Sequence, residues 1–354
     1  MLRVATGVVL GGLLLLGGTA GAQEDKKEKP PERFTGEITV SLVPVVVRVL
    51  DGAGNPVLGL KPADFRVRAG KREVPVVAVD WIGTGETVTV TEATPAPAAP
   101  IEETVEAPPP VNPGKLVVFF VQADLIPSRI SGQLRLRPYT RELLGTLRPE
   151  DLAAVVSFDS HLKLWQDFTA DRTLLHDALD EGMLFSHEHA VTPSRPVSLA
   201  EHFDREDARR AASPEQALEI VGRALQPLPG EKTLIFLGYG LGRFGADGVK
   251  MTPDYKPAVH ALGAAHASVF VLDITSADEH SLEVGLEAIA DATGGLYLKT
   301  YRLPEVATNV ISRAISGHYV LTLDRALLPE ETGELHIDLR EKSGNVLMRP
   351  VALR

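Results

Sequence analysis

The chain contains no cysteine among its 354 residues. That absence excludes a disulfide-stapled fold, thiolate catalysis, thiolate zinc sites and iron–sulfur clusters. Basic residues are also outnumbered, because 36 Lys and Arg stand against 47 Asp and Glu and give a net charge of −11. A nucleic-acid-binding protein depends on a basic surface, so this balance argues against nucleic acid as a partner. The contents of hydrophobic residues (44%) and charged residues (23%) are ordinary for a folded protein, so most of the chain is expected to fold.

The first 22 residues have the pattern of a secretory signal peptide. Arg3 precedes an apolar stretch, and the small residues Ala20 and Ala22 follow it at the positions that a signal peptidase reads. The apolar stretch is about 15 residues long, shorter than the roughly 20 that a membrane span needs. We therefore expect cleavage after Ala22, no stable membrane anchor afterwards, and an exported protein that is periplasmic or extracellular.

Composition divides the rest of the chain into segments of different character. Charged and proline residues predict a flexible leader, and a later stretch of proline and glutamate without any basic residue predicts an extended, self-repelling linker. Alternating apolar residues and turn residues predict β-strands near both ends of the mature chain. The expected segments are the signal peptide (1–22), the leader (23–36), an N-terminal β module (37–90), the linker (91–113), an α/β domain (114–316) and C-terminal β-strands (317–354).

The region 114–316 alternates strand-like and helix-like stretches. Residues 116–121 form an uninterrupted apolar run, which is typical of a strand buried on both faces. Residues 152–158 and 162–168 have the pattern of an antiparallel hairpin, and Ser213 before Pro214 predicts the start of a helix. This alternation predicts the fold class α/β, with a doubly wound, mainly parallel sheet that carries helices on both faces.

The β segments 37–90 and 317–354 each hold roughly three or four strands, too few to bury a two-sided core alone. We therefore expect the flanking strands to pair with each other into a smaller β-sandwich, with the α/β domain inserted between them. Residues 342–345 (KSGN) predict a hairpin turn between the last two strands.

Several short motifs occur together and in a recognisable order. On them the chain resembles exported von Willebrand factor A-related (vWA-related) proteins of the Acidobacterial type. The resemblance covers nearly the whole mature chain and implies a doubly wound sheet with one antiparallel edge strand. The motifs are Asp51 and Gly54 in a turn, Gly59-Leu60, Asp64-Phe65, Gly70, 148–151 (RPED), 166–172 (QDFTADR), 290–295 (ADATGG) and 318–321 (HYVL).

The resemblance also implies a divalent cation at the carboxyl ends of the strands, and here the sequence departs from the family pattern. That pattern is Asp-x-Ser-x-Ser after the first strand, a threonine in a later loop and an Asp after the fourth strand. Gln122 stands at the Asp position, Asp124 and Ile126 at the two Ser positions, and Tyr239 at the last Asp position. One carboxylate is poor compensation for dehydrating Mg²⁺. The sequence therefore predicts a degenerate metal site at Gln122, Asp124 and Tyr239, and no bound metal or cofactor.

A histidine pair offers an alternative metal site. His187 and His189 lie in the loop 184–196 and could bind zinc together with Asp124. We favour a polar surface loop, because no ligand spacing fixes a tetrahedral site. Asp273 ends a strand at the same edge of the sheet and is expected to be a strand-end turn residue.

A glycine run offers an alternative cofactor site. Residues 240–245 (GLGRFG) follow a predicted strand. From Gly240 to Gly245 they match the pattern G-x-G-x-x-G of dinucleotide-binding proteins. The pattern requires a helix after the last glycine, but Gly248 and Pro253 follow and would break one. We therefore do not expect a dinucleotide site.

These observations favour a noncatalytic protein-interaction module that binds an unknown protein or cell-envelope component. No nucleophile elbow, zinc-protease motif or phosphate-binding loop occurs in the sequence. The alternative is a zinc- or nucleotide-dependent enzyme that uses the His187/His189 loop or the 240–245 run. Aromatic and arginine side chains supply most of the binding energy at interfaces. The candidate partner-binding residues are Asp124, His187, His189, Tyr239, Arg243 and Phe244.

Export is directly testable. A fusion of residues 1–40 to a reporter that is active only outside the cytoplasm should be active, because the n-region, apolar stretch and small residues of a signal peptide are all present. The same fusion with Leu14 and Leu15 replaced by Arg should be silent. A silent unaltered fusion would contradict the prediction.

Overall fold

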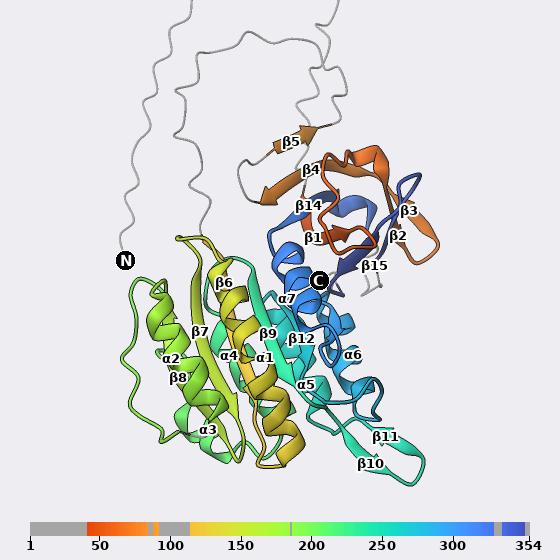
Figure 1. Cartoon of the computed structure of the whole chain (residues 1–354). Helices are drawn as coiled ribbons and strands as arrows, with labels where there is room; N and C mark the ends of the chain where they lie inside the picture. The colour runs from red at the N-terminus through yellow and green to blue at the C-terminus, as the bar shows by residue number, and fades with distance from the viewer. Residues whose placement is uncertain (1–40, 84–87, 92–113, 185, 329–334, 351–354) are drawn as a thin grey trace, which may run out of the picture. The chain divides into compact units, whose positions relative to one another are not determined.

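The computed structural model describes residues 41–83, 88–91, 114–184, 186–328 and 335–350, which belong to one compact unit. The predicted signal peptide, the leader, and the linker from residue 92 onward lie outside the described residues. Figure 1 shows the arrangement of helices and strands.

A six-stranded sheet forms the centre of the α/β segment, and its strand order is β13-β12-β9-β6-β7-β8. Neighbouring strands are parallel except at the edge, where β8 is antiparallel to β7. The order reverses direction at β6 and β9, as it does in doubly wound sheets. The predicted fold class, including the antiparallel edge hairpin, is confirmed. The strands are β6 (Leu116–Gln122), β7 (Leu152–Phe158), β8 (Leu162–Thr169), β9 (Lys232–Gly238), β12 (Ala267–Asp273) and β13 (Tyr297–Lys299).

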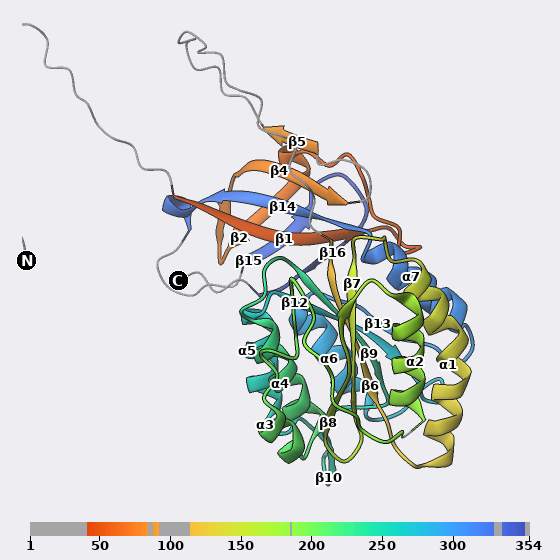
Figure 2. The ribbon, with the colours of Figure 1, turned by 90° about the vertical axis from the view of Figure 1, so that its left-hand side faces the viewer.

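Helices cover both faces of this sheet. The apolar run of β6 serves both faces, because Val118 and Phe120 belong to one core whereas Val117 and Phe119 belong to the other. Helices α3, α4, α5 and α6 pack on the first face, and α1, α2 and α7 on the second (Figure 2). The helices are α1 (Pro127–Gly145), α2 (Arg172–Met183), α3 (Arg205–Arg210), α4 (Pro214–Leu225), α5 (Tyr255–Ala264), α6 (Glu283–Thr293) and α7 (Pro304–Ala314).

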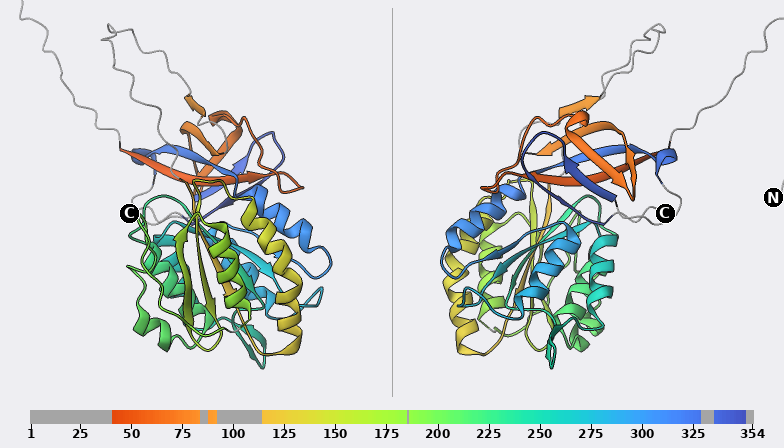
Figure 3. Two further views of the ribbon diagram at one scale, coloured as in Figure 1. Left: turned by 60° about the vertical axis from the view of Figure 1, so that its left-hand side comes forward. Right: turned by 90° about the vertical axis from the view of Figure 1, so that its right-hand side faces the viewer.

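The two flanking segments contribute strands to the same two antiparallel sheets. One sheet has the order β16-β1-β14-β4-β5 and the other β15-β2-β3, and a shared apolar core lies between them. Figure 3 shows β1, in orange-red, beside β14, in blue. The strands are β1 (Leu42–Leu50), β2 (Phe65–Ala69), β3 (Arg72–Val74), β4 (Val76–Gly83), β5 (Val88–Thr91), β14 (Gly317–Asp324), β15 (Leu335–Leu339) and β16 (Asn345–Met348).

The predicted hairpin at 342–345 is wrong. Strand β15 pairs with β2, whereas β16 pairs with β1, so the turn crosses from one sheet to the other. The physical reason is that both strands pack onto the same core from opposite sides: Ile337 is buried in it, and Val346 and Met348 pack against it. Turn chemistry alone does not distinguish a hairpin from such a crossing.

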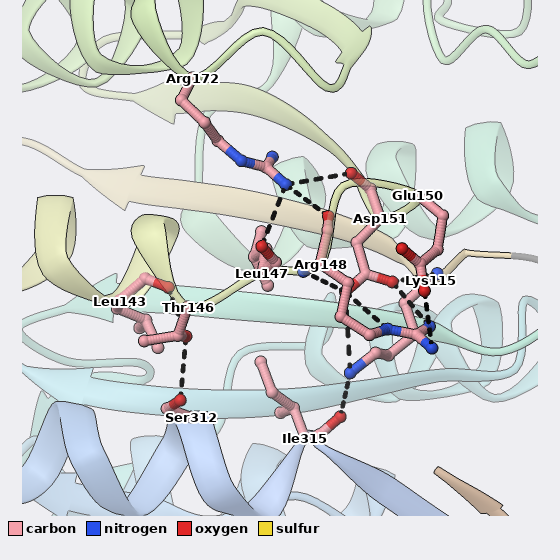
Figure 4. A network of polar contacts seen from close by, with 10 residues as sticks. All are labelled: Lys115, Leu143, Thr146, Leu147, Arg148, Glu150, Asp151, Arg172, Ser312 and Ile315. Carbon is pink, nitrogen blue, oxygen red and sulfur yellow. Dashed lines mark hydrogen bonds and ion pairs between the residues drawn. The ribbon is translucent and has the colours of Figure 1, made fainter. Parts of the chain in front are cut away.

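The motif at 148–151 is a structural hydrogen-bonding device (Figure 4). The carboxylate of Asp151 is fully buried and accepts hydrogen bonds from the backbone N–H groups of Lys115 (2.8 Å) and Arg148 (2.9 Å). The ammonium of Lys115 donates to the carbonyl of Ile315 at 2.5 Å. Arg172 donates to the carbonyl of Arg148 at 2.7 Å. The network joins the starts of β6 and β7 to the residue that follows α7.

Side chains of two further motifs, 166–172 and 318–321, also make hydrogen bonds inside the fold. The buried carboxylate of Asp167 accepts from the backbone N–H of Leu199 (2.7 Å) and the hydroxyl of Ser198 (2.6 Å), which fastens a long loop to β8. The phenol of Tyr319 accepts from the N–H of Leu60 (3.2 Å) and donates to the carbonyl of Val57 (2.8 Å). Residues from distant motifs therefore satisfy each other's polar groups inside the fold.

Buried and half-buried charged side chains lie where β1 and β14 approach the starts of β9 and β12. The guanidinium of Arg48 donates to the hydroxyl of Ser268 at 3.0 Å and lies 5.5 Å from the ring centre of Phe270. Arg349 makes two hydrogen bonds to Glu231, of 3.0 and 2.7 Å. Burial favours the neutral form of Glu231, but the charges of Arg349 and Arg48 outweigh it and hold the pKa of Glu231 below its usual range.

The charged groups around His318 predict that the free energy of unfolding depends on pH. Burial, with further contributions from Arg48, Lys115 and Arg349 and opposed by Glu231, lowers the pKa of His318 from 6.5 to about 4. Between these two values the unfolded chain binds a proton that the folded chain excludes, so the free energy of unfolding falls as the pH drops from 6.5 to 4. The expected loss is roughly 3 kcal/mol.

The measurement is urea unfolding between pH 7 and pH 4. In His318→Gln the pH-dependent loss should shrink by that amount, whereas His187→Gln, at an exposed site, should keep the wild-type slope. Equal slopes in the wild type and His318→Gln would contradict the assignment.

Candidate binding edge of the parallel sheet

The carboxyl ends of β6 and β9 are fastened together by Gln122. Its side chain is 2% exposed, and its amide oxygen accepts from the backbone N–H groups of Tyr239 (2.9 Å) and Gly240 (3.4 Å). Its amide nitrogen donates to the carbonyl of Gly240 at 2.9 Å. The oxygen that stands where the family pattern has a carboxylate is therefore occupied by backbone donors.

Asp124 and Tyr239 meet an arginine that the sequence analysis did not single out. Asp124 accepts from the backbone N–H of Ile126 at 2.9 Å, and its other oxygen forms an ion pair with the guanidinium of Arg129. Arg129 lies in the first turn of α1, and its guanidinium carbon is 3.7 Å from the ring centre of Tyr239. Burial is the main cause that raises the pKa of Tyr239 to about 12, so its phenol is neutral at physiological pH.

The resulting arrangement holds a fixed positive charge between a carboxylate and an aromatic ring. Arg129 neutralises Asp124 through charge-assisted hydrogen bonding and stacks on Tyr239 as a cation–π pair. A divalent cation at Asp124 would have to displace this guanidinium. The structure brings Gln122, Asp124 and Tyr239 together at the ends of β6 and β9 and adds Arg129 to them.

The predicted histidine loop has other neighbours. His189 is exposed, with its Nδ1 3.8 Å from Glu181 and its ring 6.0 Å from that of Trp165. His187 is also exposed. Among the described residues, three side chains lie close enough together to hold a metal ion, and neither His187 nor His189 is one of them. The structure therefore does not assemble a site from His187, His189 and Asp124.

The glycine run 240–245 enters a short hairpin instead of a helix. Strand β10 (Arg243–Gly245) pairs antiparallel with β11 (Gly248–Lys250). The helix N-terminus on which a dinucleotide's pyrophosphate would rest is therefore not formed by this run. Phe244 is 69% exposed on the hairpin, and Arg243 is exposed beside it.

Further apolar side chains are exposed at the loops that follow the parallel strands. Leu125 and Ile126 come after β6, and Tyr301 and Leu303 come after β13. Exposed apolar side chains gathered at one edge are typical of interaction surfaces. The sequence carried a signal for the first pair, because two apolar residues follow Asp124 shortly after the end of β6.

A cavity of about 1300 Å³ lies at the opposite end of the parallel strands. It is lined by residues at the amino ends of the strands, such as Leu116, Leu152 and Glu231, and by His318 of β14. The cavity is separate from the carboxyl edge, where open α/β sheets bind their ligands.

Comparisons with known proteins find similarity of structure only. No family model and no curated protein matches the chain. BatB from Bacteroides thetaiotaomicron, a conserved hypothetical protein, is 16% identical with a TM-score of 0.37 over 56% of this chain and 97% of its own. A von Willebrand factor type A protein from Catenulispora acidiphila is 13% identical with a TM-score of 0.40 over 82% of this chain and 73% of its own.

An aerotolerance-related membrane protein from Bacteroides fragilis NCTC 9343 is 15% identical, with a TM-score of 0.36 over 56% of this chain and 98% of its own. At these identities the likeness concerns the fold alone. None of the helices within the described residues is long and apolar enough to cross a membrane.

The pairing of Asp124 with Arg129 predicts a measurable coupling energy. Both side chains are about three-quarters buried, at 25% and 26% exposed. A double-mutant cycle of Asp124→Asn and Arg129→Met, followed by urea unfolding, should give roughly 1 kcal/mol of coupling. A cycle of Asp124→Asn with Arg135→Met, another arginine of the same helix, should give about zero. Equal coupling in the two cycles would contradict the pairing.

Proposed function

We propose that this chain is an exported, noncatalytic vWA-type module that binds a protein or cell-envelope partner through the carboxyl edge of its parallel sheet. We also propose that this binding does not depend on Mg²⁺. The single observation that carries it is the guanidinium of Arg129, which pairs with Asp124 and lies against Tyr239.

The vWA type is supported by the order of the motifs along the sequence and by the strand order of the sheet. Export is supported by the sequence pattern of residues 1–22. Neither the fold nor the signal-peptide pattern bears on catalysis. The noncatalytic character is proposed for the cluster at the ends of β6 and β9, because Asp124 is paired with Arg129, Tyr239 is neutral and Gln122 is bound to backbone groups, so that none of them is poised as a nucleophile or general base.

The independence from Mg²⁺ follows from charge and ligand count. Mg²⁺ prefers six oxygen ligands and several negative charges, whereas the cluster of Gln122, Asp124, Arg129 and Tyr239 offers one carboxylate that already has a cationic partner. A partner's carboxylate would gain nothing from a bridging cation here. Contact with Tyr239, Arg243 and Phe244 would supply the binding energy instead, since aromatic and arginine side chains dominate interfaces.

The experiment begins with the full chain as bait against the periplasmic and envelope fractions of its source. Affinity for the purified partner should stay within about twofold when Mg²⁺ is added to chelator-treated protein, because no step of binding recruits it. An affinity that is lost on chelation and restored by Mg²⁺ would contradict the proposal.

The face itself is tested by substitution. The double variant Tyr239→Ala, Arg243→Ala should lose about tenfold or more in affinity, which corresponds to roughly 1.4 kcal/mol. Arg72→Ala, at an exposed position of the three-stranded sheet, is the matched control and should bind as the wild type does. Unchanged affinity in the double variant would show that the partner uses another face.

A further inference from the structure

A buried carboxylate lies at the end of β12, two strands along from the cluster around Arg129. Asp273 is 2% exposed, and one of its oxygens accepts from the backbone N–H of Thr275 at 2.9 Å, as a strand-end turn residue does. The other oxygen lies 2.7 Å from Nε2 of His280 and 2.6 Å from the hydroxyl of Tyr297. A buried charge is stable only when it is paired or bound to a metal.

A second carboxylate approaches the same point. Glu283 is the first residue of α6, and the Oε2 atom of its carboxylate lies 3.3 Å from the hydroxyl of Tyr297 and 2.9 Å from the ammonium of Lys299. One ligand atom each from Asp273, His280 and Glu283 lies within 4.8 Å of the others. The strand end, the following loop and the helix start thus deliver two carboxylates and one imidazole to one place.

We propose that Asp273, His280 and Glu283 form a zinc site with three protein ligands and one open position. Imidazole nitrogen and carboxylate oxygen are both zinc ligands, and three protein ligands with a fourth position for water make a complete tetrahedral set. Two carboxylates balance the charge of Zn²⁺. This inference goes beyond the proposed function, because it concerns neither the partner nor the cluster around Arg129.

To hold the ion, the short contact between His280 and Asp273 would have to open, and the wider contacts of the group, which all lie within 4.8 Å, would have to close. Ligand atoms around tetrahedral zinc lie roughly 3.4 Å apart, so the contact between His280 and Asp273 would open from 2.7 Å by less than about 1 Å. Magnesium fits poorly, because it prefers six oxygen ligands and the group contains a nitrogen.

Tyr297 supports the site from outside, whereas the ammonium of Lys299 is paired with Oε2 of Glu283 and would have to give up that oxygen if the ion binds it. The hydroxyl of Tyr297 donates to Asp273 and reaches Glu283, and Lys299 donates to Glu283. Carboxylates that bind a metal are held in orientation by such hydrogen bonds, and losing one costs about 10–100-fold in metal affinity. Tyr297 is therefore a positioning residue whose hydroxyl, and not its ring, matters for the metal.

The test uses the full chain, purified without a histidine tag and stripped with chelator, then titrated with Zn²⁺ in competition with a chromogenic chelator. The wild type should bind one equivalent, and its Tm should rise on binding. His280→Gln and Glu283→Gln should each weaken the affinity by about 100-fold or more, and Tyr297→Phe by about 10–100-fold. The double variant His187→Gln, His189→Gln is the control and should bind as the wild type does.

Circular dichroism of the stripped variants checks that each is folded before its affinity is compared. Absence of saturable binding in the wild type would overturn the proposal, as would binding that survives in both His280→Gln and Glu283→Gln. Loss of binding in the His187/His189 variant would also overturn it, by moving the ion to that loop. Partner binding by His280→Gln separates the two proposals: retained affinity in a zinc-free protein leaves the proposed function standing.

Discussion

The pairing of β1 with β14 joins two segments that lie on opposite sides of the α/β segment in sequence. Val47 is opposite Tyr319 in this ladder, and both are buried in the sandwich core. Such a ladder can form only if the α/β segment brings its two ends together. The hydrogen bond from Lys115, at its start, to Ile315, at its end, shows that it does. The buried Arg48 and the half-buried pair of Arg349 and Glu231 can meet their partners only when both parts are folded.

The motifs on which the chain resembles the vWA-related proteins turn out to be parts of the scaffold. Asp151 and Asp167 bind backbone N–H groups, and Tyr319 links the second β segment to the first. Each of these side chains satisfies backbone polar groups in the interior by hydrogen bonding. Such bonds are required for folding, whether or not a ligand is bound. A resemblance carried by such residues therefore transfers the architecture without transferring a binding partner.

At the ends of β6 and β9, the positive charge beside Asp124 is supplied by a side chain of the chain itself. The positive charge of a bound metal ion is present only when the ion's concentration suffices and the ion has been dehydrated. The positive charge of Arg129 is part of α1 and is always present. Gln122 keeps the two strand ends at their spacing through hydrogen bonds to the backbone of β9's terminus. The exposed side chains around this edge include Leu125 and Phe244.

The sequence by itself determined the α/β class, the buried parallel strands and the edge hairpin, because apolar runs and period-two patterns depend on local spacing alone. It also placed Gln122, Asp124 and Tyr239 at one edge, since the carboxyl ends of parallel strands meet there. Only the tertiary structure decided that 342–345 crosses between sheets, that Arg129 pairs with Asp124, and that His280 lies beside Asp273. These outcomes depend on which core a strand packs against and on where a side chain several residues away points in three dimensions, and no local pattern encodes either.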